Sequence, residues 1–129
     1  MKGDTSMTKV KILVVDDDAD TRLILGTKLK KQGYLVLNAA DSYQAISMAR
    51  QEAPDVILLD LGLPGGNGFI VLERLKAITS LADIPVIVVS SQEPGEVESR
   101  VLEAGPVLFI KKPVDQEQIL TALHTALLS

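Results

Sequence analysis

The segment DVILLDLGLP, residues 55–64, contains an unbroken apolar run, residues 56–59, that ends on a carboxylate, Asp60. This run is too short for a free-standing helix and has the length of a strand buried on both faces. Four glycines and a proline follow within eight residues, which favours a loop with a tight backbone path. We therefore expect Asp60 to lie at the C-terminal edge of a sheet, where open α/β sheets bind ligands. Taken alone, Asp60 could equally end the strand or cap the next helix.

The composition limits the class of protein. The chain has 129 residues, which is enough for one domain with a single core, and it is 47% hydrophobic but only 3% aromatic. It contains no cysteine, which excludes disulfides and thiolate chemistry and suits a cytoplasmic location. A net charge of −4 argues against nucleic acid as a direct partner. No apolar run approaches the roughly 20 residues that span a bilayer, so we expect no membrane association.

The chain divides into a polar, flexible tail at residues 1–8 and one domain at residues 9–129. Within the domain, apolar strand patterns alternate with helical patterns five times. The predicted strands cover residues 9–15, 35–39, 55–59, 84–89 and 107–110. The predicted helices cover residues 19–32, 42–52, 67 or 68 to 78, 94–104 and 115–127. This alternation predicts an α/β fold, a doubly wound five-stranded parallel sheet with right-handed crossovers.

Two helices carry more detailed expectations. The helix at residues 19–32 is expected to bury Thr21, Ile24, Leu25 and Leu29 on one face. The last helix begins with Asp115 and has Gln118 three residues later, which is a capping-box pattern. Its expected buried face comprises Ile119, Leu123, Ala126 and Leu127.

Polar residues follow four of the predicted strands. In the strand order 2-1-3-4-5, the C-terminal ends of the strands meet at one edge, and strands one and three are neighbours. Three carboxylates that converge there need a cation to stay ionised, and oxygen-only ligands suit Mg²⁺. A lysine and hydroxyls beside them would hold an anion, which together are the parts needed for phosphoryl transfer to a carboxylate. The residues concerned are Asp16, Asp17, Asp60, Ser90, Ser91 and Lys112.

Each of these residues also has a structural explanation. One aspartate of the run at residues 16–18 can cap the following helix, and Lys112 can be a solvated lysine like Lys111. His124, the only histidine, is expected at the surface. These explanations do not account for the joint placement of polar residues on four separate strand ends.

On these motifs the chain resembles a response-regulator receiver domain over residues 9–128. Asp16 and Asp17 after the first strand resemble the metal-binding acidic pair of that family, and the loop that starts at Asp60 resembles its phospho-acceptor loop. Ser90 stands at the hydroxyl switch position and Phe109 at the aromatic switch position. Lys112 followed by Pro113 resembles the family's lysine and cis proline.

The resemblance implies a function and a set of partners. Asp60 would accept a phosphoryl group from a sensor histidine kinase or a histidine phosphotransfer protein. Mg²⁺, or Mn²⁺, would bind Asp16, Asp17, Asp60 and the backbone carbonyl of Gly62, while Ser90, Ser91 and Lys112 would bind the phosphoryl group. The face made by the helix at residues 94–104, the fifth strand and the last helix would control an effector or a homodimer. The family is a signalling phospho-acceptor that catalyses its own phosphotransfer and dephosphorylation.

Several positions depart from the usual pattern of the family. Gly62 has no side chain to shield the phosphoryl group, and together with Gln92 it lies where the family tunes dephosphorylation. Ser91 replaces a more usual alanine, and Pro106 and Leu108 make the edge before Phe109 stiffer and more apolar.

Two other functions compete with this interpretation. The run at residues 16–18 also resembles the D-x-D motif of haloacid-dehalogenase-type phosphohydrolases, with Asp16 as the nucleophile. That hypothesis leaves Asp60 unexplained and lacks a later acidic motif for the metal. The second competitor is a flavodoxin-like binding module with a degenerate site, which predicts no binding of divalent metal.

Overall fold

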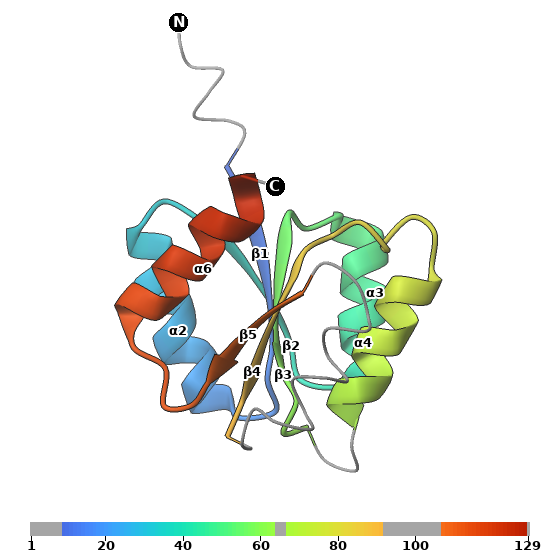
Figure 1. Ribbon diagram of the computed structural model, residues 1–129, viewed down its shortest axis with the longest axis horizontal. Helices are drawn as coiled ribbons and strands as arrows, with labels where there is room; N and C mark the ends of the chain where they lie inside the picture. The colour runs from blue at the N-terminus through green and yellow to red at the C-terminus, as the bar shows by residue number, and fades with distance from the viewer. Residues whose placement is uncertain (1–8, 64–66, 92–106, 129) are drawn as a thin grey trace, which may run out of the picture.

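Five parallel strands form one sheet, in the order β2-β1-β3-β4-β5 (Figure 1). The computed structural model describes residues 9–63, 67–91 and 107–128. The strands are β1 Lys11–Val15, β2 Leu35–Ala39, β3 Val56–Asp60, β4 Val86–Ser90 and β5 Val107–Lys111. The predicted doubly wound parallel sheet and its strand order are confirmed.

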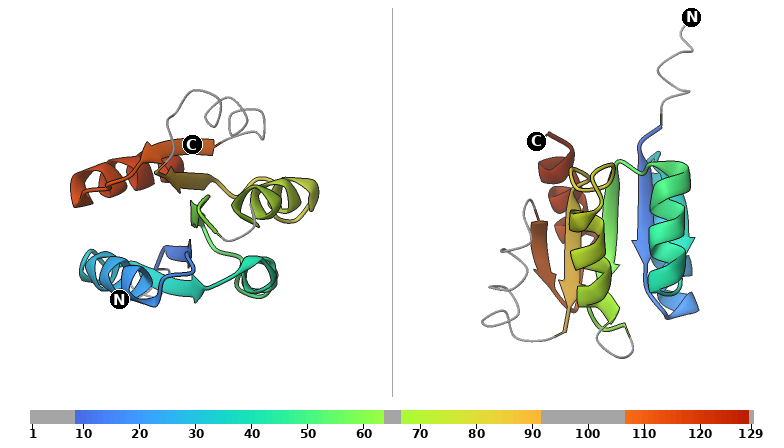
Figure 2. Two further views of the ribbon diagram at one scale, coloured as in Figure 1. Left: turned by 90° about the horizontal axis from the view of Figure 1, so that it is seen from below. Right: turned by 90° about the vertical axis from the view of Figure 1, so that its right-hand side faces the viewer.

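Helices cover both faces of the sheet. They are α2 Ala19–Lys31, α3 Ser42–Glu52, α4 Asn67–Ala77 and α6 Gln116–Leu128. Helices α2 and α6 lie on one face, and α3 and α4 lie on the other (Figures 1 and 2). The predicted tail at residues 1–8 and the predicted helix at residues 94–104 lie outside the described residues.

The central strand β3 explains why the sheet has two cores. All five of its residues are buried. Val56 and Leu58 pack into the cluster beneath α2 and α6, while Ile57 and Leu59 pack into the cluster beneath α3 and α4. Successive side chains of a strand point to opposite faces, so an unbroken apolar run is what a strand covered by helices on both sides requires.

Aspartate side chains cap the N-termini of α2 and α6. Asp18 caps α2, where its carboxylate accepts hydrogen bonds from the Asp20 amide (3.2 Å) and the Thr21 hydroxyl (2.7 Å). At α6 the Asp115 carboxylate accepts from the Gln118 amide (2.8 Å), and the Gln118 side chain accepts from the Asp115 amide (3.2 Å). The predicted capping box at Asp115 is therefore confirmed.

Several predicted boundaries were wrong by one or two residues. Strand β1 begins at Lys11 instead of residue 9, β5 continues to Lys111, and helices α2 and α4 each end one residue early. Strand β4 begins at Val86 instead of residue 84 and continues to Ser90. The late start of β4 has a local cause, because the Ile84 amide donates to the Leu81 carbonyl in a turn.

The predicted buried face of α2 was wrong at Ile24, whose side chain is 58% exposed. The buried residues of this helix are Gly26 and Leu29. A Cβ added at Gly26 would lie 3.6 Å from Val36 Cγ1, so the helix approaches strand β2 along its glycine. The helix is rotated accordingly, and Leu23 and Ile24 are left at the surface. In α6 the buried residues are Ile119, Ala122, Leu123 and Ala126, and Leu127 is half-buried.

Candidate functional site

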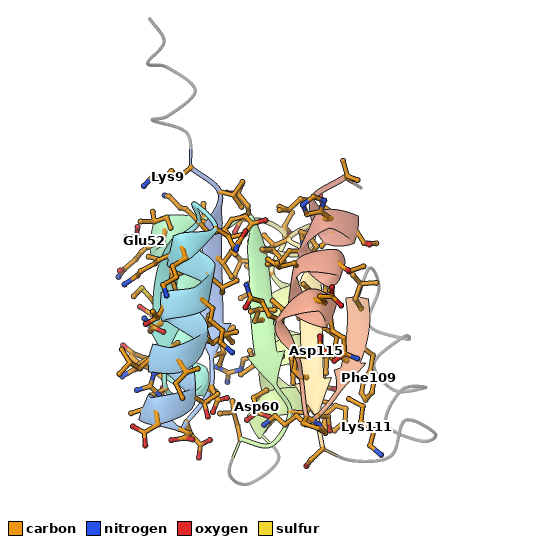
Figure 3. All side chains as sticks on the ribbon, turned by 90° about the vertical axis from the view of Figure 1, so that its left-hand side faces the viewer. Lys9, Glu52, Asp60, Phe109, Lys111 and Asp115 are labelled. Carbon is orange, nitrogen blue, oxygen red and sulfur yellow. The ribbon has the colours of Figure 1, made fainter. Side chains whose placement is uncertain are left out.

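Three carboxylates meet at the C-terminal ends of the neighbouring strands β1 and β3. Carboxylate oxygens of Asp16, Asp17 and Asp60 all lie within 4.8 Å of one another. Figure 3 shows Asp60 at the same end of the sheet as Lys111, opposite the end that carries Lys9 and Glu52. The arrangement results from topology, because β1 and β3 pair in parallel with Val15 opposite Leu59, and Asp16 and Asp60 are the next residues along the chain.

Asp16 is held in this cluster by its backbone and its side chain. Its amide donates to the Ala39 carbonyl (3.1 Å), and its carboxylate accepts from the Asp18 amide (2.9 Å). Burial raises the pKa of Asp16, and the negative charges of Asp60 and Asp17 raise it further, against the opposing effects of the Asp18 amide and Lys112. The ionised cluster is therefore costly, and a bound cation would lower that cost.

Asp60 is the last residue of β3 and is only 6% exposed. One carboxylate oxygen accepts a hydrogen bond from the Gly62 amide (2.8 Å), and the other lies 3.3 Å from the Lys112 ammonium. Lys112 is fixed in turn by its amide, which donates to the Ser90 carbonyl (2.8 Å). The carboxylate therefore has a fixed orientation and a cation beside it.

Gly62 leaves the approach to Asp60 open. A Cβ added at this glycine would lie 3.1 Å from an Asp60 carboxylate oxygen. A side chain at this position would press against the carboxylate, so the absence of one at Gly62 leaves Asp60 uncrowded.

Of the other predicted site residues, some lie beside Asp60 and others lie away from it. Ser90 is buried at the end of β4, and Ser91 lines the same groove as Asp60 and Lys112. The peptide bond between Lys112 and Pro113 is cis, the isomer that the resemblance implied. Phe109 stands apart from the cluster: it is half-buried in β5, opposite Val88, and packs against the core beneath α3 and α4. Gln92 and Pro106 lie outside the described residues.

Sequence reasoning missed a groove that leads from α2 and α6 to Asp60. Its volume is about 620 Å³, and its apolar walls include Ile24, Leu25, Ile119 and Leu120. The signal was the run of three apolar residues at 23–25, because three consecutive positions of a helix cannot all face one core. One face of this run must be exposed, and it lies beside the candidate site.

The donor set determines what the site can bind. Its carboxylates offer hard oxygen ligands and no nitrogen or sulfur, which suits Mg²⁺. The Lys112 ammonium and the nearby hydroxyls suit an anion next to that cation. The site therefore fits a divalent cation and a phosphoryl group together.

Comparison with known proteins identifies the family. The family model of the response regulator receiver domain matches residues 12–124. Protein PilH of Pseudomonas aeruginosa is 36% identical over 91% of this chain and 97% of that protein. Sporulation initiation phosphotransferase F of Bacillus subtilis is 33% identical over 91% of this chain and 93% of that protein.

Solved structures agree with this assignment. The chemotaxis protein CheY4 of Vibrio cholerae superposes with a TM-score of 0.86 at 25% identity and covers 92% of this chain and 99% of its own. A CheY-like receiver domain protein of Methanospirillum hungatei gives a TM-score of 0.85 at 27% identity, covering 93% and 94% of the two chains.

Some relatives are much longer than this chain. It spans only 46% of the probable transcriptional regulator ycf27 of Guillardia theta, with 34% identity over 93% of this chain. What these relatives share with the chain is therefore the domain that carries Asp60. The chain belongs to the response regulator receiver domain family.

Proposed function

We propose that Asp60 accepts a phosphoryl group from a sensor histidine kinase or a histidine phosphotransfer protein. The observation that carries this proposal is the setting of Asp60, a buried carboxylate that contacts Lys112 and shares a cluster with Asp16 and Asp17. Asp16 is the nucleophile in the competing phosphohydrolase hypothesis. The family match favours Asp60 as the acceptor over that hypothesis.

Asp16, Asp17, Asp60 and the backbone carbonyl of Gly62 would hold Mg²⁺ or Mn²⁺. The fit rests on the oxygen-only donor set and on the burial and crowding of charge that raise the pKa of Asp16. When bound, the cation neutralises charge on the phosphoryl oxygens and on the carboxylates.

The protein's own residues orient the reaction. The Gly62 amide holds one oxygen of Asp60, and the Lys112 ammonium lies beside the other. One carboxylate oxygen attacks phosphorus, the bond from phosphorus to the donor imidazole breaks, and the imidazole nitrogen keeps the electron pair. Lys112 then pairs with the phosphoryl oxygens, and the hydroxyls of Ser90 and Ser91 donate to them.

The reverse loss of phosphate needs water at the same centre. Gly62 offers no side chain that could exclude or orient this water, and a Cβ there would crowd Asp60. We therefore assign the domain the capacity to release its own phosphate, with a rate set at position 62 and at Gln92.

The donor would dock over the groove between α2 and α6. Leu23 and Ile24 are 69% and 58% exposed, and Ile24 lines the groove that leads to Asp60. Exposed apolar side chains beside an acceptor give a protein donor the hydrophobic contact that an isolated phosphate lacks. This docking mode supports a protein as the phosphoryl source.

The output would use the face made by residues 94–104, β5 and α6, toward an effector or a second copy of the chain. Phe109 in β5 would change its packing when Ser90 turns toward a phosphoryl group. The net charge of −4 supports protein partners over direct contact with nucleic acid. No described helix has the length and apolarity to cross a bilayer. We propose a cytoplasmic location.

Mass spectrometry tests the acceptor. The chain is incubated with Mg²⁺ and a small acyl phosphate, and the modified residue is identified. We expect the phosphate on Asp60 and none on Asp60→Asn, while Asp41→Asn, a change at an exposed helix cap, is labelled normally. A label on Asp16 would support the phosphohydrolase hypothesis and overturn ours.

A titration with Mg²⁺ tests the metal ligands. Asp17 is exposed, so Asp17→Asn removes a carboxylate from the cluster without leaving a buried group unpaired. We expect weaker binding of Mg²⁺ and slower labelling of Asp60 in this variant. An unchanged affinity for Mg²⁺ would remove Asp17 from the ligand set.

A further inference from the structure

A second groove lies between α3 and α4, on the face of the sheet opposite α2 and α6. Figure 2 shows these two helices side by side on that face. The groove has a volume of about 570 Å³, and its lining includes Tyr43, Ile46, Arg50, Arg74 and Ile78. On α3, Tyr43 and Arg50 are seven residues apart and share one side of the helix; Arg74 lies in α4, and Ile78 follows directly after the last residue of α4.

Arg50 and Arg74 are the cationic side chains of this groove. Within the described part of the chain, the side chains of Arg50 and Arg74 form no hydrogen bond or ion pair. No carboxylate is among the described residues that line the groove. The two guanidinium groups can therefore bind an anionic group of a partner. They form a local cationic site in a protein whose net charge is −4.

The groove also has apolar side chains, which an anion alone would not cover. Ile46 is 9% exposed, Ile78 is half-buried, and Tyr43 beside them is 80% exposed. An aromatic ring exposed to this degree, next to arginines and aliphatic side chains, has the composition of interface hot spots, which are enriched in Tyr, Trp and Arg.

We propose that the groove between α3 and α4 is a docking site for an acidic amphipathic helix of a partner protein. The apolar residues of that helix would pack on Ile46, Ile78 and the ring of Tyr43, and its carboxylates would pair with Arg50 and Arg74. A helix that lies in such a groove presents its anchor residues along one face, at spacings of three and four residues.

Charge and shape favour a protein partner over nucleic acid. Nucleic-acid binding depends on many contacts between phosphates and basic side chains, and the described lining provides two basic residues. The apolar floor at Ile46 and Ile78 would gain nothing from a phosphate backbone, whereas apolar side chains of a helix would be buried there.

Nuclear magnetic resonance of the isotope-labelled chain tests the proposal. The probe is a 16-residue helical peptide with leucine at spacings of three and four and glutamate at the flanking positions. We expect chemical-shift changes concentrated in α3 and α4. We expect affinity to fall about tenfold in the double variant Arg50→Ala, Arg74→Ala, since each exposed ion pair contributes a factor of a few.

A charge swap gives the matched control. In the double variant Arg50→Glu, Arg74→Glu, the glutamate peptide should bind weakly, and the same peptide with lysine in place of glutamate should bind better than it does to the wild type. The variant Lys30→Ala, Lys31→Ala changes two exposed cations of α2 and should bind the acidic peptide normally.

Three results would overturn the proposal. The first is the absence of shifts in α3 and α4 at millimolar peptide. The second is binding that survives both double variants at the arginines. The third is a single-stranded oligonucleotide that binds this groove more tightly than the acidic peptide does, which would assign the site to nucleic acid.

Discussion

Asp16 is a residue whose ionised form opposes folding when no cation is present. Its carboxyl is buried and lies beside Asp60 and Asp17, and these effects raise its pKa above the ordinary 3.8. The folded state therefore holds the proton more tightly than the unfolded state does. The stability that this gives is complete below pH 3.8 and is lost as the pH rises through the folded-state pKa, so at neutral pH the ionised group costs stability.

Asp16→Asn should therefore stabilise the metal-free protein at pH 7. The asparagine keeps the oxygen that accepts the Asp18 amide and removes the charge. We expect the free energy of unfolding in EDTA to rise, because the variant no longer holds a buried negative charge beside Asp60 and Asp17. Urea unfolding measures it. With Mg²⁺ the order should reverse, because the wild type gains the energy of binding. A less stable variant in EDTA would contradict this account of Asp16.

Helix α4 begins in close contact with the backbone of Asp60 and Leu61. A Cβ added at Gly68, in the first turn of α4, would lie 2.5 Å from Leu61 Cα and 2.9 Å from the Asp60 carbonyl oxygen. Both are backbone atoms that cannot move aside without shifting the end of β3. The glycine therefore allows α4 to start directly against Asp60.

Gly68→Ala and Gly26→Ala should have opposite effects on stability. The first forces backbone atoms apart and should cost about 2 kcal/mol or more, as overpacking does. The second adds a methyl group in ordinary contact with Val36 inside helix α2, and it should stabilise by about 0.5–1 kcal/mol because alanine is the better helix former. Urea unfolding of both variants measures the contrast. Equal changes in the two would show that the close approach at Gly68 is not rigid.

The sequence predicts which segments form strands and helices better than it predicts how the helices pack. Strands, helices and the site edge followed from the apolar runs and from polar residues at strand ends, because parallel strands end at one edge. The rotation of α2 about its axis could not be predicted from the sequence. The apolar spacing placed Ile24 in the buried stripe, and nothing in the sequence showed that Gly26 would pack against the sheet instead. The grooves beside α2 and α3 depend on how helices pack, which periodicity alone does not determine.

Lys76 fixes the end of α4 to the segment before β4. Its ammonium donates to the carbonyls of Ala82 (3.2 Å) and Ile84 (3.0 Å). Burial lowers its pKa below 10.5, against the opposing charge of Asp83. Between the folded-state pKa and 10.5 the unfolded chain binds more protons, so this group adds stability as the pH rises through that window.

The variant Lys76→Met isolates this contribution. Methionine does not titrate, so the variant lacks the pH dependence that Lys76 contributes. The unfolding free energy of the wild type should therefore increase relative to that of the variant as the pH rises from 8 to 10.5. Paired urea unfolding at several pH values measures the difference, and groups common to both proteins cancel. A difference that stays constant across this range would show that Lys76 is not desolvated in the folded protein.

At the scale of the whole molecule, β3 connects Asp60 to both cores. Its apolar residues alternate between the cluster beneath α2 and α6 and the cluster beneath α3 and α4. Phe109 packs against the second cluster from β5, a strand that has a neighbour on one side only in the described sheet. We propose that a change at Asp60 reaches the edge of the sheet through β4 and Phe109, without a change in the fold.

Hydrogen exchange tests this route from Asp60 to the edge. We expect acyl phosphate with Mg²⁺ to change amide exchange in β5 and α6 as well as at Asp60, because moving a switch from 10% to 90% of the active state takes only about 2.6 kcal/mol. In Phe109→Leu, which keeps an apolar side chain, Asp60 should still be labelled while the change in α6 disappears. If exchange changed only near Asp60, or if Phe109→Leu behaved as the wild type does, the signal would leave the site by another face, and the groove between α3 and α4 would be the next surface to measure.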